Sequence, residues 1–171
     1  ILMNRKILKS ILFSFAIVSI IACNEKKGDT QDAVIDKEAI KKEIQAKENL
    51  FAETYNSGQK KKIGYYADDA ISFAQNRAPL VGKDAIVEFL LDGIDSKENS
   101  NKISFTTNDV FVSNDGIQVV EIGFYKVVDS ANTIVNSGNY MSLFEKRDGN
   151  YVSVRDMSVS NMPIEQLLDD E

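Results

Sequence analysis

One carboxylate near the end of the chain stands where acid–base chemistry could take place. The segment 151–160 alternates like a β-strand, and Val152, Val154 and Asp156 share one of its faces. If that face is the inner one, Asp156 lies at the wall of an apolar cavity, where burial raises the pKa of a carboxyl group. Such a group can act as a general acid or a general base.

Glu121 and Tyr140 are the other candidates for a catalytic role. Both fall on predicted strands and could face the same space as Asp156, one as a second carboxylate and the other as a hydroxyl donor. The alternative is a structural role, in which Asp156 is hydrogen-bonded to a tyrosine or to Arg155. Structural networks also contain perturbed carboxylates, and we prefer this second interpretation.

The composition excludes several other kinds of site. The 171 residues contain no His, which excludes His-based triads and His metal ligands. The single Cys, Cys23, leaves no intrachain disulfide and no Cys-rich metal site. No glycine-rich phosphate-binding motif is present, so we expect neither a cofactor nor a metal. The net charge of −6 argues against nucleic acid as a partner.

Residues 1–22 have the pattern of a secretory signal. Basic residues precede an apolar run over 11–21, which is too short for a comfortable transmembrane helix. The tetrapeptide 20–23, Ile-Ile-Ala-Cys, resembles a bacterial lipobox, which implies that Cys23 is lipidated and becomes the mature N-terminus. An uncleaved anchor helix, or an ordinary signal with an incidental Cys, is the alternative. We expect attachment to a membrane of a bacterial cell envelope, facing outside the cytoplasm.

The chain divides into four parts by composition. A signal peptide over 1–22 is followed by a polar tether over 23–32, which begins at the lipidated Cys. Residues 33–162 are expected to form one folded domain, and 163–171 an acidic tail.

Helical periodicity dominates the first half of this domain. Apolar residues recur at helical spacing over 33–57, which predicts one long amphipathic helix. A short helix is expected over 59–66, a short strand over 70–74 and a third helix over 83–94.

In the second half of the domain, apolar residues recur at every second position. Strands are predicted over 102–112, 117–128, 133–146 and 151–160, with turn-forming residues between them. Four consecutive strands joined by short turns predict an antiparallel meander.

This order of elements, together with short motifs at their junctions, resembles the NTF2-like superfamily and within it the SnoaL-like and DUF4440-type domains. The matching motifs are Tyr55–Gly58, Tyr65–Ala70, Val81–Ile86 and the closing hairpin Gly138–Asp156. The resemblance implies an α+β cone, in which a curved antiparallel sheet wraps around the long N-terminal helix and two short helices are added. It also implies a pocket at the open end and, in many members, a homodimer through the outer face of the sheet.

The resemblance implies less about function. The ketosteroid isomerases of this superfamily use an Asp base shortly after the ADDA-like motif and a Tyr on the first helix. These positions fall on Ala74 and Phe51, which have neither a carboxylate nor a hydroxyl. We therefore expect a non-catalytic module that binds a small ligand or a protein. The alternative is a SnoaL-like isomerase or hydrolase that uses a cavity carboxylate with a Tyr donor.

The expected pocket has aromatic walls and one polar anchor, which suits a small, largely apolar ligand. The residues predicted to contact the ligand are Tyr55, Tyr66, Phe73, Tyr125, Tyr140 and Asp156.

Overall fold

The computed structural model describes residues 35–58, 64–95 and 101–163, without the side chains of 92–95. The predicted signal peptide and the tether, including Cys23, lie outside these ranges. In the part described, no helix is long and apolar enough to cross a membrane.

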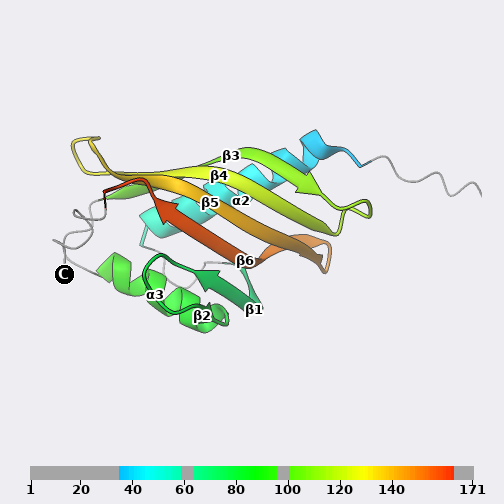
Figure 1. Cartoon of the computed structure of the whole chain (residues 1–171), viewed down its shortest axis with the longest axis horizontal. Helices are drawn as coiled ribbons and strands as arrows, with labels where there is room; N and C mark the ends of the chain where they lie inside the picture. The colour runs from blue at the N-terminus through cyan, green and yellow to red at the C-terminus, as the bar shows by residue number, and fades with distance from the viewer. Residues whose placement is uncertain (1–34, 59–63, 96–100, 164–171) are drawn as a thin grey trace, which may run out of the picture. The chain divides into compact units, whose positions relative to one another are not determined.

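Within these ranges the chain forms two helices and six strands (Figure 1). The elements are α2 Lys37–Asn56, β1 Tyr66–Phe73, β2 Leu80–Val81, α3 Lys83–Asp95, β3 Lys102–Val112, β4 Gln118–Val128, β5 Ile134–Arg147 and β6 Asn150–Ser160. The α+β class, the long first helix, the helix α3 and the four-strand meander are those that the sequence predicts. The two-residue strand β2 was not predicted.

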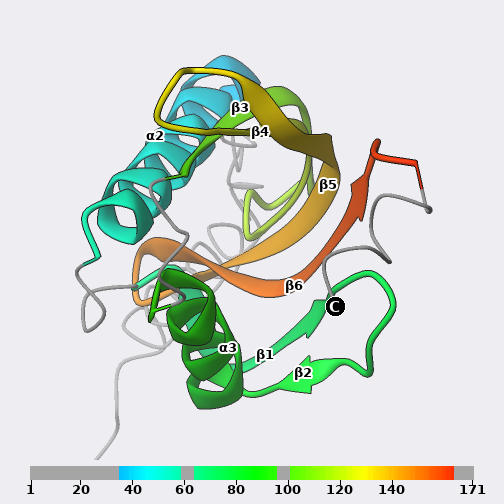
Figure 2. The same cartoon turned by 90° about the vertical axis from the view of Figure 1, so that its left-hand side faces the viewer.

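All six strands belong to one curved sheet in the order β2-β1-β6-β5-β4-β3. The strands from β3 to β6 pair in antiparallel fashion, whereas β1 lies beside β6 and runs parallel to it. The sheet is therefore mixed rather than wholly antiparallel. Figure 2 shows it curving from β3, which packs on α2, round to β1, which packs on α3.

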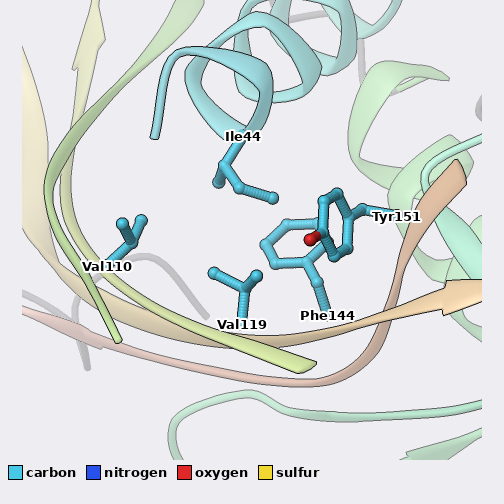
Figure 3. Packing of buried hydrophobic residues seen from close by; sticks show 5 residues of the cluster. All are labelled: Ile44, Val110, Val119, Phe144 and Tyr151. Atoms are coloured by element: carbon cyan, nitrogen blue, oxygen red, sulfur yellow. The ribbon is translucent and has the colours of Figure 1, made fainter. Parts of the chain in front are cut away.

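A buried cluster holds α2 against four strands of the sheet (Figure 3). Ile44 of α2 meets Val110 of β3, Val119 of β4, Phe144 of β5 and Tyr151 of β6. Burying each apolar side chain of this size stabilises the fold by about 1.5–3 kcal/mol. The cluster closes one end of the space between the helix and the sheet.

The segment before β1 differs from its prediction. Tyr65 is not helical and Tyr66 opens β1, so the predicted helix over 59–66 does not extend this far; 59–63 lie outside the described residues. The carbonyl of Tyr65 accepts a hydrogen bond from the backbone N–H of Ser153 at 2.9 Å. Pairing with a strand far along the chain therefore prevails over the local pattern, and aromatic residues favour strands.

Strand β6 contains one extra residue relative to β5. This residue, Val154, lies between two residues that pair with adjacent positions of β5. The bulge reverses the alternation, so that Tyr151 faces the interior on one side of it and Asp156 on the other. The prediction that Val152, Val154 and Asp156 share one face opposite Tyr151 is wrong, because it assumed an unbroken alternation.

Candidate functional site

A partly open cavity of about 390 Å³ lies between the concave face of the sheet and the two helices. Its walls are mostly aromatic and aliphatic, from Phe51, Tyr55, Tyr65, Tyr66, Ala74, Ile86, Phe89, Leu90, Ile103, Phe105, Tyr125, Val127, Tyr140 and Met157. Its polar lining consists of Glu48, Ser72, Asn136, Ser142, Asp156 and Ser158. Among the described residues, no Lys or Arg side chain lines this cavity.

Two glycines allow tyrosines to lie flat against the sheet at this cavity. Gly123 faces Tyr140 across β4 and β5, and a Cβ atom on Gly123 would lie 2.2 Å from the ring carbon Cζ. Gly138 faces Tyr125, and a Cβ atom there would lie 2.6 Å from ring carbon Cε1. A larger residue at position 123 would push the Tyr140 ring away from the sheet, and at position 138 its Cβ atom would also clash with the backbone carbonyl oxygen of Val159 at 2.0 Å.

Asp156 presents a carboxyl group to the cavity with one oxygen unused. The Tyr66 hydroxyl donates to Oδ2 at 2.8 Å, whereas Oδ1 is buried and has no hydrogen-bond partner in the structure. Burial raises the pKa of Asp156, and hydrogen bonds from Ser72 and Tyr66 oppose that rise. The site therefore offers a ligand one free acceptor in apolar surroundings.

Glu48 brings a second carboxyl group to the cavity from helix α2. Only 1% of the residue is exposed. The Tyr65 hydroxyl donates a short hydrogen bond to Glu48 Oε1 and lies 3.4 Å from Ser142 Oγ. Burial, and secondly the neighbouring Glu121 carboxylate, raises the pKa of Glu48 to about 9. Glu48 is therefore protonated at neutral pH.

Glu121 lies directly behind this surface with no exposed area. Its Oε1 accepts hydrogen bonds from Thr107 at 2.5 Å and from Tyr140 at 2.8 Å. Its Oε2 is buried, and a side-chain hydrogen bond also joins Glu121 to Glu48. Burial raises the pKa of Glu121, and the hydrogen bonds from Thr107, Tyr140 and Glu48 counteract part of that rise.

Strand register places the polar groups of the sheet in one row. Glu121 of β4 pairs with Ser142 of β5, Ser142 pairs with Asp156 of β6, and Asp156 pairs with Ser72 of β1. Side chains of directly paired residues lie on the same face of a sheet. The row runs through an interior that is mostly apolar. Asp156 belongs to this row only because the bulge at Val154 turns it towards the interior.

The structure separates the residues predicted to contact a ligand into two groups. Five of the six line the cavity, namely Tyr55, Tyr66, Tyr125, Tyr140 and Asp156. Phe73 does not: it is 42% exposed, because Ser72 faces the cavity and successive residues of a strand face opposite sides. The residues at the isomerase positions, Ala74 and Phe51, both line the cavity.

Two important residues were missed by the sequence reading. Glu48 follows Ile44 by four residues and precedes Phe51 by three, so it lies on the apolar stripe of α2. An acid on the buried face of an amphipathic helix is a signal that could have revealed it. Tyr65 was missed because it was assigned to a helix.

The arrangement can bind and exchange protons but offers no ready metal site. No group of three or more His, Cys, Asp or Glu side chains in the described ranges is placed to hold a metal ion. What the cavity does contain is two carboxyl groups, each hydrogen-bonded to a tyrosine hydroxyl.

Comparison with solved structures identifies the fold. A domain of unknown function with a cystatin-like fold from Nostoc punctiforme superposes with a TM-score of 0.63 at 16% identity, over 78% of this chain and 84% of its own. The hexachlorocyclohexane dehydrochlorinase LinA-type3 from Novosphingobium barchaimii superposes with a TM-score of 0.62 at 18% identity, over 74% of this chain and 90% of its own. A ketosteroid isomerase-like protein from Erwinia carotovora atroseptica superposes with a TM-score of 0.56 at 17% identity, over 75% of this chain and 100% of its own.

These similarities establish that the chain has the NTF2-like, or cystatin-like, cone fold. A scan against protein-family models finds no match, and a search among curated proteins finds none either. Identities below 25% support the fold alone.

The raised pKa of Glu48 predicts that stability falls as the pH rises. An unfolded Glu has a pKa of 4.5 and Glu48 one of about 9, so between these values the folded protein holds an extra proton. This proton makes its full contribution to the free energy of unfolding below pH 4.5. The contribution decreases as the pH rises towards 9, by at most about 1.4 kcal/mol per pH unit. Urea denaturation at pH 5, 7 and 9, followed by circular dichroism, measures this slope.

The substitution Glu48→Gln should flatten the slope, because Gln keeps the acceptor for Tyr65 but cannot ionise. Glu53→Gln, on the exposed side of the same helix, is the control and should leave the slope unchanged. Equal slopes for the parent protein and Glu48→Gln would show that Glu48 is not protonated in the folded state.

Proposed function

We propose that this protein is a lipid-anchored binding module of the cell envelope. Its cavity holds a small, largely apolar ligand that donates a hydrogen bond to Asp156. The observation that carries the proposal is the buried Oδ1 atom of Asp156, which lacks a partner in the wall of an otherwise apolar cavity.

The size of the cavity supports a ligand rather than a packing defect. Pockets for small molecules span about 300–1,000 Å³, and the volume here, about 390 Å³, lies within that range. The two glycine–tyrosine pairs keep this space clear of the tyrosine rings.

The energetics of the unused acceptor point in the same direction. A buried acceptor without a partner costs about 1–3 kcal/mol of stability. A ligand hydroxyl or N–H group at Oδ1 would remove this cost, while its apolar body would cover the aromatic walls.

Binding of 1-naphthylmethanol tests the proposal. We expect this alcohol to bind about five- to tenfold more tightly than its methyl ether, since only the alcohol can donate to Asp156. Asp156→Leu should abolish that preference, and Asp68→Leu, at a carboxylate that is 98% exposed, should retain it. Isothermal titration calorimetry of the full chain in non-ionic detergent, with empty micelles as blank, gives the affinities. Failure of both naphthalenes to bind would refute the proposal.

A second candidate function is acid–base catalysis at the same carboxyl group. It is favoured by the hydrogen bond from Tyr66 to Asp156 and by the raised pKa of Asp156, which brings a carboxylate closer to the basicity that proton abstraction needs. A dehydrochlorinase among the proteins of similar fold shows that such a cone can host an enzyme. In this scheme, Asp156 Oδ1 accepts a proton from a carbon atom of the substrate, while the Tyr66 hydroxyl keeps its hydrogen bond to Oδ2.

Exchange of the α-protons of 2-tetralone in heavy water tests this second function. An active site of this kind should accelerate the exchange about 100-fold over buffer, and Asp156→Asn should remove the acceleration. Glu53→Gln serves again as the control. Proton NMR follows the loss of signal, and exchange at the buffer rate by the parent protein would exclude the catalytic alternative for this ketone.

The lipid anchor is tested independently of the cavity. We expect the parent chain to fractionate with membranes, because several acyl chains on one residue hold a protein far more firmly than one chain does. Cys23→Ser should move it to the soluble fraction and remove the mass of the lipid. Unchanged mass and fractionation after this substitution would show that Cys23 is not lipidated.

A further inference from the structure

We infer that the ligand of this cavity is an organic ammonium ion, with a protonated amine at the inner end of an apolar body. The inference rests on the proposed binding function and specifies its ligand. It starts from the lining of the cavity, which contains two carboxyl groups and, among the described residues, no Lys or Arg.

Glu48 and Asp156 line the cavity, and Glu121 lies directly behind Glu48. No Lys or Arg of the described chain forms an ion pair with any of them; the ion pairs there join Lys83 to Asp68 and Arg147 to Asp69 and Glu145. Within the part of the chain that the structure describes, the acids of the site therefore have no basic side chain as a countercharge. A bound cation would supply it, and a bound anion would be repelled.

The free acceptors match the donors of an ammonium group. Asp156 Oδ1 is buried, unpartnered and part of a residue that lines the cavity. Ser142, the direct neighbour of Asp156 in the sheet, adds a hydroxyl oxygen on the same face. An ammonium group carries three N–H donors and no acceptor, so it needs several such oxygens.

The walls also suit a cation. Tyr65 and Tyr66 lie with ring centroids 4.9 Å apart, and Phe51 packs on Tyr65 at 5.0 Å. Phe105 continues this cluster, 5.5 Å from both Phe51 and Tyr140. Aromatic faces attract a desolvated cation within about 6 Å, most strongly where water is excluded. These five rings all line the cavity, and the hydroxyl groups of Tyr65 and Tyr66 are hydrogen-bonded to its two carboxyl groups.

A neutral ligand would use only part of this arrangement. An alcohol could donate one hydrogen bond to Asp156 Oδ1, but it would bring no positive charge to that carboxylate. Hydrogen bonds between an ionised donor and a carboxylate are roughly twice as strong as neutral ones. The site should therefore rank an amine above an alcohol of the same shape.

The test compares 1-naphthylmethylamine with 1-naphthylmethanol at pH 7, by calorimetry of the full chain in non-ionic detergent. We expect the amine to bind at least tenfold more tightly. Asp156→Asn, which keeps an acceptor but removes the charge, should reduce this ratio at least fivefold, whereas Asp68→Asn should leave it unchanged. The comparison of the two ligands on the parent protein needs no variant, so it stands even if Asp156→Asn fails to fold.

The outcomes separate this inference from the function on which it rests. An alcohol that binds as tightly as the amine overturns the inference and leaves the binding function in place. Absence of binding by both compounds overturns both. An amine preference that Asp156→Asn does not change, in a folded variant, overturns the assignment of the ammonium group to Asp156.

Discussion

Buried carboxyl groups that form no ion pair with any described basic side chain are the constraint on which the interior of this domain depends. Glu48 and Glu121 have essentially no exposed surface, and burial of an unpaired charge costs several kcal/mol. The fold meets this cost by raised pKa values and by hydroxyl donors from three separate places, namely Tyr65 ahead of β1, Thr107 in β3 and Tyr140 in β5. Tyr66 in β1 donates to Asp156 in the same way. These donors are useful only if the strands keep their register, so the polar row and the sheet geometry specify one another.

The cavity depends on small departures from regular sheet geometry. Gly123 and Gly138 remove the Cβ atoms that would otherwise lift two tyrosine rings into the cavity. Because of the bulge at Val154, Asp156 faces the interior although Tyr151, five residues earlier in the same strand, also does so. A perfectly regular β6 would place Asp156 on the outer face, and the cavity would lose its unpartnered oxygen.

The sequence predicted the elements better than the site because periodicity is a local property and the site is not. Alternation and turn residues located β3 to β6 to within a residue or two, since those strands pair with their neighbours in the chain. Tyr66 was assigned to the wrong element because its partner strand is distant. Phe73 was assigned to the wrong face for lack of register. Glu48 was overlooked because charged residues on a helix are normally solvent-exposed, and only the three-dimensional packing shows that this one is not.

The parallel pairing of β1 with β6 has a consequence for how the domain assembles. The hydrogen bond from Tyr66 to Asp156 joins residues 90 positions apart. The strand that contains Asp156, β6, is the last strand along the chain. Contacts of such long sequence separation form slowly, since a long loop must be ordered before they contribute any stability. The meander can pair strand by strand as the chain is made, but the wall that carries the unpartnered oxygen closes only after β6 has been inserted between β5 and β1. The cavity wall that contains Asp156 therefore forms only once the chain has been made through β6.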